Sequence, residues 1–498
     1  MNDNVFSLFE AAHGNYPDRV IIETEDGHQY RGRDLLASSG RYATLLARLG
    51  TGRGDRVVVQ AEKSVQSLFF YLACLRAGVI YVPLNTAYRR AELAYFLGDA
   101  QPKLVICSPQ SKAEIESLTD ATVLTLNEEG EGSLQDALAS VTREAPVAAV
   151  AADDTAVIIY TSGTTGRSKG AMITHRNLSS NTRVLVEYWA FSSRDVLVHA
   201  LPIFHIHGLF VANHTALAAG AKILWHRKFD PKGVLAALPE ATILMGVPTV
   251  YTRLLAEPTF GREAVRNMRL FISGSAPLLL DTFSEFEGRT GHRILERYGM
   301  SEAGMITSNP LQGIRAGGTV GLPLPGNAVR VAGEHDRPLG RGEAGGIQIK
   351  GDNVFAGYWK MPEKTKEEFT ADGWFKTGDV GVFDESGYLS IVGRAKDLII
   401  SGGYNVYPKE VELVLDALPG VLESAVIGVP HPDFGEAVTA VLVLRKEARL
   451  SEVEVITQVK AQLANYKTPK RVHIVEDLPR NAMGKVQKNI LREKFSKI

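Results

Sequence analysis

The stretch VIIYTSGTTGRSKG, residues 157–170, decides the fold. Its first four residues are β-branched or aromatic and predict a buried strand. The glycines that follow allow a tight turn with exposed backbone N–H groups, and Lys169 adds a positive charge, so we interpret the turn as a phosphate-binding loop. It is not a Walker A loop, because Gly170 rather than Ser or Thr follows Lys169. The other glycines and the hydroxyl-bearing residues of the loop are Gly163, Gly166, Thr161, Ser162, Thr164 and Thr165.

Short apolar runs alternate with amphipathic segments on both sides of this loop. Such alternation predicts an α/β fold with largely parallel sheets. From about residue 317 to 393, Gly and Pro become dense and long helices disappear, which predicts a β-rich subdomain or, alternatively, a separate domain. After residue 393 a small α+β domain is expected, with helices at 411–417 and 453–463 and strands at 423–429 and 437–444. The predicted strands of the large part are 56–60, 79–82, 104–107, 157–160, 222–224, 242–245, 270–273 and 346–350.

Composition excludes several classes of protein. The 498 residues include 55 Lys and Arg against 56 Asp and Glu, a net charge of −1, and 45% are hydrophobic. These values argue against a disordered chain and against a nucleic-acid binder that acts through a general positive field. The apolar window 67–84 is interrupted by Arg76 and Gly78, so we expect a helix and a strand rather than a membrane span. Cys74 and Cys107 are expected to be buried apolar residues. No signal for secretion is seen, and a cytoplasmic protein is predicted.

Six motifs, in this order, resemble those of the adenylate-forming superfamily, which includes acyl-CoA synthetases, luciferases and the adenylation domains of peptide synthetases. The first is the loop at 160–170, and the resemblance covers nearly the whole chain. It implies that a carboxylate is joined to the α-phosphate of ATP, a reaction promoted mainly by positioning and electrostatic stabilisation. The other motifs are FISGSAP (271–277), ERYGMSE (296–302), WFKTGDVG (374–381), GRAKDLIISGGYNVYPKEVE (393–412) and PRNAMGK (479–485).

The resemblance implies an ATP site with magnesium. Glu302 and Thr165 would bind Mg²⁺, Tyr298 would stack on adenine, and Asp379 would accept hydrogen bonds from the ribose, reinforced by Arg394. Taken alone, Glu302 could be the acid at the start of a helix and Asp379 a turn residue. The predicted ATP-binding residues are Thr161, Ser162, Gly163, Thr164, Thr165, Gly166, Lys169, Gly274, Ser275, Ala276, Glu296, Arg297, Tyr298, Gly299, Met300, Ser301, Asp379, Arg394 and Lys485.

The C-terminal motifs imply a catalytic lysine on a mobile domain. Lys485 would bridge the acid and the α-phosphate, although taken alone it could be a solvated lysine. Lys488 stands where the family often has arginine, which we expect to be harmless. Lys396 would be the hinge between an adenylating and a thioester-forming pose, and Gly402 and Gly403 would leave room for the CoA thiol. The implied domains are 1–395, for acid, ATP and Mg²⁺, and 396–498, which carries the lysine.

The predicted acyl pocket contains polar groups. Around FHIHGLF (204–210) and VPTVYTRLL (247–255), the residues expected to bind the acid are Arg253, Ser275, His205, His207 and Met305, with His205 also assigned a catalytic role. These segments resemble those of malonyl-CoA synthetases, in which the arginine and the serine hold the distal carboxylate. Ile206 stands where threonine is often found, which puts the choice between malonate, methylmalonate and another short diacid in doubt. Alternatively, Arg253 is an exposed helical residue. A metal site at His205 and His207 is not expected, because no further ligand cluster accompanies them.

The sequence therefore predicts a malonate–CoA ligase that uses ATP, CoA and Mg²⁺ and forms malonyl-AMP. The alternatives are a CoA ligase for methylmalonate or another small or aromatic acid, a free-standing enzyme that loads a carrier protein, and a luciferase-like oxygenase. A fused carrier domain is not expected, because only 13 residues follow Lys485. A non-catalytic binding protein is not expected either, because Lys485, Glu302 and the loop are all present. No nucleic-acid or membrane partner is predicted, and a monomer or weak homo-oligomer is expected.

Overall fold

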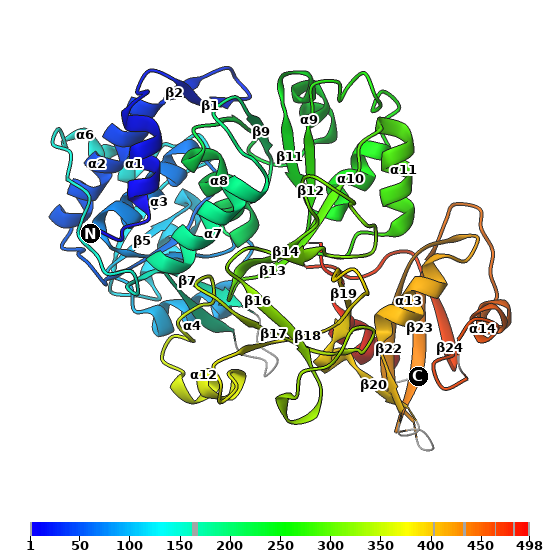
Figure 1. Ribbon diagram of the computed structural model, residues 1–498. Coiled ribbons are helices and arrows are strands. Elements are labelled where there is room, and N and C mark those ends of the chain that lie inside the picture. The colour runs from blue at the N-terminus through cyan, green and yellow to red at the C-terminus, as the bar shows by residue number, and fades with distance from the viewer. Residues whose placement is uncertain are drawn as a thin grey trace.

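The computed structural model describes residues 2–161, 168–401, 404–431, 435–463, 465–481 and 484–496, with all their side chains except those of residues 396, 404 and 405. Within these ranges the strands form four sheets, surrounded by helices (Figure 1). The predicted α/β class is confirmed, with a large N-terminal part and a small C-terminal part.

A six-stranded sheet carries the phosphate loop. Its strands are parallel apart from the last pair, and their buried Val and Ile runs are typical of a sheet covered on both faces. Thr161 pairs with Lys169, so the two ends of the loop lie side by side. The order is β6 (Thr122–Thr125), β5 (Leu104–Cys107), β3 (Arg56–Gln60), β4 (Ile80–Pro83), β7 (Thr155–Thr161) and β8 (Lys169–Thr174).

A nine-stranded sheet supplies the second wall. Its central strands, from β13 to β1, run parallel, so the segments that follow β9, β11, β12 and β13 meet at one edge, where α/β proteins commonly bind ligands. The order is β15 (Leu322–Pro323), β14 (Gly304–Ser308), β13 (Leu295–Met300), β12 (Leu270–Ser273), β11 (Ile243–Gly246), β9 (Val196–His199), β10 (Lys222–Trp225), β1 (Val20–Thr24) and β2 (Gln29–Arg31).

The predicted β-rich region forms a four-stranded antiparallel sheet. Ile347, Phe375 and Leu389 from this sheet belong to the same apolar core as the two large sheets. The region is therefore a subdomain of the large part and not a separate domain. Its strands are β16 (Ala328–Ala332), β17 (Gly345–Lys350), β18 (Phe375–Phe383) and β19 (Leu389–Arg394).

The C-terminal part has a sheet and apolar cores of its own. It lies to one side of the large part, at the right of Figure 1. The helices and strands expected after residue 393 are confirmed, although the second predicted helix ends three residues early, at Lys460. The elements are β20 (Ile399–Ser401), β21 (Tyr404–Val406), α13 (Pro408–Asp416), β22 (Val421–His431), β23 (Gly435–Leu444), α14 (Glu452–Lys460), β24 (Arg471–Val475) and α15 (Lys488–Phe495).

The apolar window 67–84 forms helix α3 (Val65–Ala77) and then strand β4, as predicted. Ser64 caps the helix by accepting a hydrogen bond from the Ser67 N–H, and Gly78 ends it in the left-handed conformation, with φ of 68°. No helix in the described ranges is both long and apolar enough to cross a membrane. Cys74 and Cys107 are buried free thiols, as expected.

The remaining helices pack around the large part. The α-helices are α1 (Phe6–Gly14), α2 (Gly32–Arg48), α4 (Arg90–Ala100), α5 (Lys112–Glu116), α6 (Ser133–Ala139), α7 (His175–Tyr188), α8 (Asn213–Ala218), α9 (Pro231–Ala237), α10 (Pro248–Leu255), α11 (Leu280–Thr290) and α12 (Pro362–Glu368). A π-turn, η2 (His207–Ala212), precedes α8, and short 3₁₀ turns are η1 (Pro109–Ser111), η3 (Leu238–Glu240), η4 (Glu334–Asp336) and η5 (Ala395–Asp397).

Candidate active site

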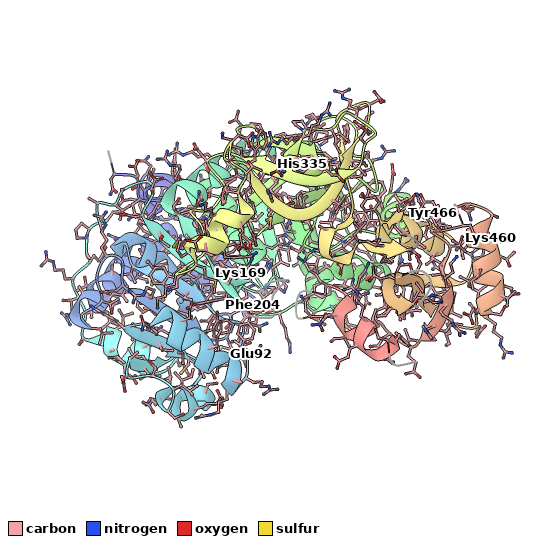
Figure 2. The ribbon with its side chains drawn as sticks, turned by 90° about the horizontal axis from the view of Figure 1, so that it is seen from below. Glu92, Lys169, Phe204, His335, Lys460 and Tyr466 are labelled. Atoms are coloured by element: carbon pink, nitrogen blue, oxygen red, sulfur yellow. The ribbon has the colours of Figure 1, made fainter. Side chains whose placement is uncertain are left out.

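Polar side chains gather where the nine-stranded sheet ends and the phosphate loop begins. Figure 2 shows Lys169, at the end of the loop, and Phe204, in the segment after β9, near the middle of the molecule. Lys460 and Tyr466 belong to the C-terminal part, at the right of the same view. Of the predicted loop, Ser162, Gly163, Thr164, Thr165 and Gly166 lie outside the described residues.

Lys169 is buried and already paired. Its Nζ lies 2.7 Å from Glu368 Oε1 and 4.1 Å from the centre of the Tyr358 ring. Burial alone would raise the pKa of Glu368, but the hydrogen bond and charge of Lys169 outweigh it and lower that pKa. A fixed cation is therefore held at the exit of the loop.

Glu302 lies in a turn between β13 and β14 and does not start a helix. Its side chain is buried, and burial raises the pKa of the carboxyl. The Thr161 hydroxyl donates to Glu302 Oε1 over 3.2 Å, and the Tyr358 hydroxyl lies 3.2 Å from the same oxygen. A buried carboxylate beside the loop fits a magnesium ligand, since Mg²⁺ is usually held by one or two carboxylates together with phosphates and water. Among the described residues, no three His, Cys, Asp or Glu side chains cluster into a metal site.

Tyr298, Asp379 and Arg394 form one connected group. The Tyr298 hydroxyl donates to Asp379 Oδ2 over 2.6 Å, and Arg394 Nε lies 3.2 Å from Asp379 Oδ1. Asp379 lies within strand β18 and pairs with Arg394 of β19, so it is not a turn residue. Burial, followed by the Asp379 charge, raises the pKa of Tyr298 well above its usual value. The hydrogen bond to Asp379 holds the Tyr298 ring in place, and its hydroxyl stays protonated. A fixed, uncharged ring of this kind can stack on a flat base.

Lys485 enters this region from the C-terminal part. The pKa of its ammonium is lowered to about 8, mainly by burial and then by the charge of Arg394, while Asp379 and Glu302 oppose the shift. The adjacent Gly484 lies against α10, where an added side chain would approach within 3.7 Å of Thr249 Oγ1. The structure thus brings Lys485 to the predicted magnesium and ribose ligands.

The two predicted histidines lie on the segment after β9. The His207 N–H donates to His205 Nδ1 over 3.2 Å, and His207 Nδ1 lies 3.3 Å from the Ser275 Oγ. The pKa of His205 is lowered to about 3, mainly by burial and then by the charges of Lys485 and Arg297. Burial also lowers the pKa of His207 well below its usual value. Both imidazoles are therefore neutral at pH 7 and can donate hydrogen bonds to an anion without adding charge.

Arg297 has a position that the sequence did not suggest. Because side chains alternate along a strand, Arg297 of β13 points to the face opposite Glu296 and Tyr298. Its guanidinium is buried and lies against Gly274, where a side chain would come within 2.4 Å of it. Within the described part of the chain, its Nε and Nη2 atoms have no hydrogen-bond partner, nor do Ser273 Oγ and His207 Nε2.

Burial lowers the pKa of Arg297 to about 10, so the group stays charged at pH 7. Buried charges without partners are costly, and groups of this kind commonly await a ligand. The alternation of side chains along β13 is the sequence signal that places Arg297 on the face opposite Glu296 and Tyr298.

The remaining predicted residues form the walls of the site. Gly274 is buried, Ser275 and Ala276 are partly buried, and Ser275 has a φ of 70°, a strained conformation for a non-glycine residue and one that clusters at functional sites. Burial raises the pKa of Glu296 to about 7, and its Oε1 accepts from the Leu278 N–H, away from the other ATP-site candidates. The other wall residues are Gly299, Met300 and Ser301.

Met305 is fully buried and fixed by Asn181. The Asn181 amide accepts from the Met305 N–H over 3.1 Å and donates to its carbonyl over 2.9 Å. A side chain at Gly299 would come within 2.4 Å of Met305 Cε, so this end of the site is closed.

Arg253 is exposed on α10, and no ion pair or hydrogen bond is found for it among the described residues. It follows Thr249 by four residues, so it lies on the helix face that Gly484 approaches. Gly402, Gly403 and the side chain of Lys396 lie outside the described residues.

Comparison with known proteins identifies this arrangement. Residues 9–359 match the model of the AMP-binding enzyme family, and residues 410–485 match that of the AMP-binding enzyme C-terminal domain. The malonate–CoA ligase of Arabidopsis thaliana is 34% identical over 98% of this chain and 89% of its own. The feruloyl-CoA synthase of an Amycolatopsis species is 37% identical over 93% of both chains.

One solved protein matches in two states. ATP-bound MatB from Rhodopseudomonas palustris is 53% identical and has a TM-score of 0.97 over 100% of this chain and 99% of its own. The apo form of MatB, with the same identity and coverage, has a TM-score of 0.87. The present arrangement of the chain therefore resembles the ATP-bound form more than the apo form.

The chain belongs to the AMP-binding enzyme family. Within that family it is an AMP-forming acyl-CoA synthetase, a class that uses ATP and CoA as substrates.

Proposed function

We propose that this chain is an ATP-dependent malonate–CoA ligase. An oxygen of one malonate carboxylate attacks the α-phosphorus of ATP, and the bond to pyrophosphate breaks to give malonyl-AMP. The thiolate of CoA then attacks the acyl carbon, and AMP leaves. Relatives named malonate–CoA ligases from a plant and from mammals support this choice of acid.

The buried guanidinium of Arg297 is the observation that carries the choice of acid. An acid with a single carboxylate, which reacts with ATP, would leave the positive charge of Arg297 without a partner. A diacid could pair its second carboxylate with that guanidinium. The free Nε and Nη2 atoms suit a bidentate pair, which is stronger than a single hydrogen bond. Ser275 and the neutral His207 line the same site and can donate further hydrogen bonds.

The size of the site favours a short acid. Met305 is fully buried, and its backbone is held on both sides by Asn181, so this wall cannot recede without breaking two hydrogen bonds. The neighbouring Ile206 is buried as well, and its side chain takes up room that a threonine would leave. We therefore expect malonate to be preferred over methylmalonate.

The nucleotide would be held by the connected group on the other face of β13. In this proposal Tyr298 stacks on adenine, and Asp379 accepts from the ribose hydroxyls while it stays paired with Arg394. Lys169 would leave its ion pair with Glu368 and bind phosphate oxygens of ATP. Lys485 would bridge the α-phosphate and the attacking carboxylate.

Glu302 would be the protein's magnesium ligand, together with Thr165 of the loop. The metal, when bound, neutralises phosphate charge that develops as pyrophosphate leaves. Glu302 fits this role because it is buried beside the loop and ionises with difficulty unless a cation is near.

The proposed domains are residues 1–395 and 396–498, with the hinge at Lys396 in the turn η5. Contacts on the two sides of this turn go to different parts of the molecule. Arg394 pairs with Asp379 of the large part, and Asp397 pairs with Arg492 of α15 over 2.6 Å. A rotation would therefore be absorbed by the backbone between these two ion pairs, as is usual for hinges.

A panel of acids with ATP and CoA, read out by AMP release, tests the function. The panel contains malonate, methylmalonate, succinate, acetate, benzoate and ferulate. We expect malonate to give the highest kcat/KM. A preference for acetate or ferulate, both of which have a single carboxylate, would overturn the proposal. Omission of CoA should leave malonate-dependent exchange of pyrophosphate into ATP.

A further inference from the structure

Lys63 is a buried lysine that joins the two large sheets. It lies in the connection between β3 and α3, and its acceptors lie at the ends of β9 and β10. Its Nζ donates to the His199 carbonyl over 2.8 Å and to the His226 carbonyl over 2.7 Å, and lies 3.3 Å from His199 Nδ1. Among the residues that the structure describes, no carboxylate forms an ion pair with it. Burial lowers the pKa of Lys63 well below its usual value, opposed by the charge of Glu25, and three acceptors lie within hydrogen-bond reach of its Nζ.

The His199 ring connects Lys63 to the candidate active site through hydrogen bonds of its two nitrogens. Its Nε2 lies 3.1 Å from the Gly208 carbonyl, which can only accept, so the ring proton must be on Nε2. Its Nδ1 is then the acceptor for Lys63 and for the Leu201 N–H, 3.3 Å away. Burial, followed by the Lys63 charge, lowers the pKa of His199 well below its usual value, so the ring is neutral.

Gly208 is the second residue of the π-turn that begins at His207. Its carbonyl also accepts from the Asn213 side chain over 2.9 Å. A side chain at Gly208 would come within 2.1 Å of the Pro202 carbonyl, so the turn is packed tightly against the segment that precedes it. π-Helical turns are rare and are frequently found at functional sites. His207 is the first residue of this one, and His205 lies two residues before it.

We propose that Lys63 is a positioning residue, which through His199 and Gly208 holds the π-turn that directs His205 and His207 at the acid. Lys63 itself lies outside the substrate site and acts only through this chain of hydrogen bonds. The inference rests on the proposed function for its kinetic consequence, but the hydrogen-bond chain can be tested without any substrate.

Lys63→Met keeps the length and removes the donors. Removing this donor leaves the His199 and His226 carbonyls short of a hydrogen-bond partner, so we expect a modest fall in Tm with the fold retained. The KM for malonate should rise about tenfold with kcat within threefold, because a small displacement of a positioning group is costly. The KM for ATP should not change. Lys222→Met is the matched control, since Lys222 pairs with Glu23 on the same sheet and has no contact with the π-turn. An unchanged KM for malonate in Lys63→Met would overturn the inference.

Two variants of His199 distinguish loss of the hydrogen-bond chain from misfolding. His199→Gln can still accept from Lys63 and donate to Gly208, whereas His199→Leu can do neither. We expect the glutamine variant to stay within threefold of the parent KM for malonate and the leucine variant to resemble Lys63→Met. Equal behaviour of the two variants would contradict the proposed chain.

NMR of ¹⁵N-histidine-labelled protein separates this inference from the proposed function. His199 should show an Nε2–H tautomer in the parent, and the ring signals of His205 and His207 should shift in Lys63→Met but not in Lys222→Met. Unchanged signals in Lys63→Met would overturn the inference. If the parent shows no malonate-dependent activity, the proposed function fails and the NMR result still decides the role of Lys63.

Discussion

The two faces of β13 differ in how their polar groups are satisfied. On the Tyr298 face, the tyrosine hydroxyl, Asp379 and Arg394 are bonded to one another. On the Arg297 face, the guanidinium Nε and Nη2, His207 Nε2 and Ser273 Oγ are buried and have no partner among the described residues. Glu296 Oε2, on the Tyr298 side of the strand, is also buried without a partner among the described residues, but the Tyr298, Asp379 and Arg394 group itself is pre-organised by the protein. The Arg297 face depends more on its ligand. A site with buried unpaired donors discriminates strongly, because a wrong ligand leaves them unpaired. Selectivity for the acid should therefore come from the Arg297 face.

Lys485→Ala should have the largest effect, because the role proposed for Lys485 is to bridge the α-phosphate and the attacking carboxylate. Removal of one such electrostatic contact typically costs a factor of about a hundred to a thousand in kcat. We expect malonate-dependent pyrophosphate exchange to fall by about a thousandfold while ATP binding, measured by calorimetry, changes by less than threefold. Near-normal exchange would exclude a catalytic role for this lysine.

Lys396→Pro should separate the two half-reactions. Proline fixes φ near −65°, which would hinder rotation at the hinge. Pyrophosphate exchange should stay within threefold of the parent, whereas malonyl-CoA formation should fall by about a hundredfold. Lys396→Ala serves as the control and should retain both. Equal losses in the two half-reactions would place the hinge elsewhere.

Asp379→Asn should weaken the pre-organised face alone. A hydrogen bond to a charged group contributes about 1.5–3 kcal/mol, so the KM for ATP should rise about tenfold or more. The KM for malonate should stay within twofold. A larger effect on malonate than on ATP would contradict the division between the two faces.

The charge of Lys485 should also appear in the pH profile. Because burial lowers its pKa to about 8, the ammonium is present below that pH and is lost above it. We expect kcat/KM for malonate to decline as the pH rises through about 8, since kcat/KM reports the ionisation of the free enzyme. In Lys485→Arg, whose guanidinium stays charged, residual activity should show no such decline. The same decline in that variant would assign it to another group.

Arg253→Ala should have the smallest effect of these changes. Exposed ion pairs contribute about 0.2–1 kcal/mol, so the KM for malonate should rise by about two- to fivefold and the KM for ATP should stay constant. Equal changes in both would remove Arg253 from the acid site. A rise larger than that caused by loss of Arg297 would give the exposed arginine the principal role.

Local patterns in the sequence predicted most of the fold. The strand before the phosphate loop, the helix and strand at 67–84 and the small C-terminal part all follow from apolar periodicity and glycine placement over short distances. The roles of Tyr298, Asp379 and Lys485 could be predicted only through resemblance, because these residues come from β13, β18 and the C-terminal part.

Two buried basic residues take proposed roles that the sequence did not suggest. The resemblance implied an ATP-binding role for Arg297 with its neighbours in ERYGMSE, whereas the alternation of side chains along the strand supports the role at the acid that we propose. Lys63 gave no local signal, since its acceptors lie 136 and 163 residues further along the chain. Contacts of this kind depend on how the two sheets pack and not on any pattern around the residue.

The most direct test of the central claim is the ratio of kcat/KM for malonate to that for acetate, measured in the parent and in Arg297→Met. Acetate has the reacting carboxylate but not the second one. We expect the parent to favour malonate by about ten thousandfold or more, the scale seen where a site binds a group that the competitor lacks. The ratio should fall to about ten or less in Arg297→Met, mainly through loss of malonate activity. A ratio that stays within threefold of the parent value would contradict the assignment of the second carboxylate to Arg297.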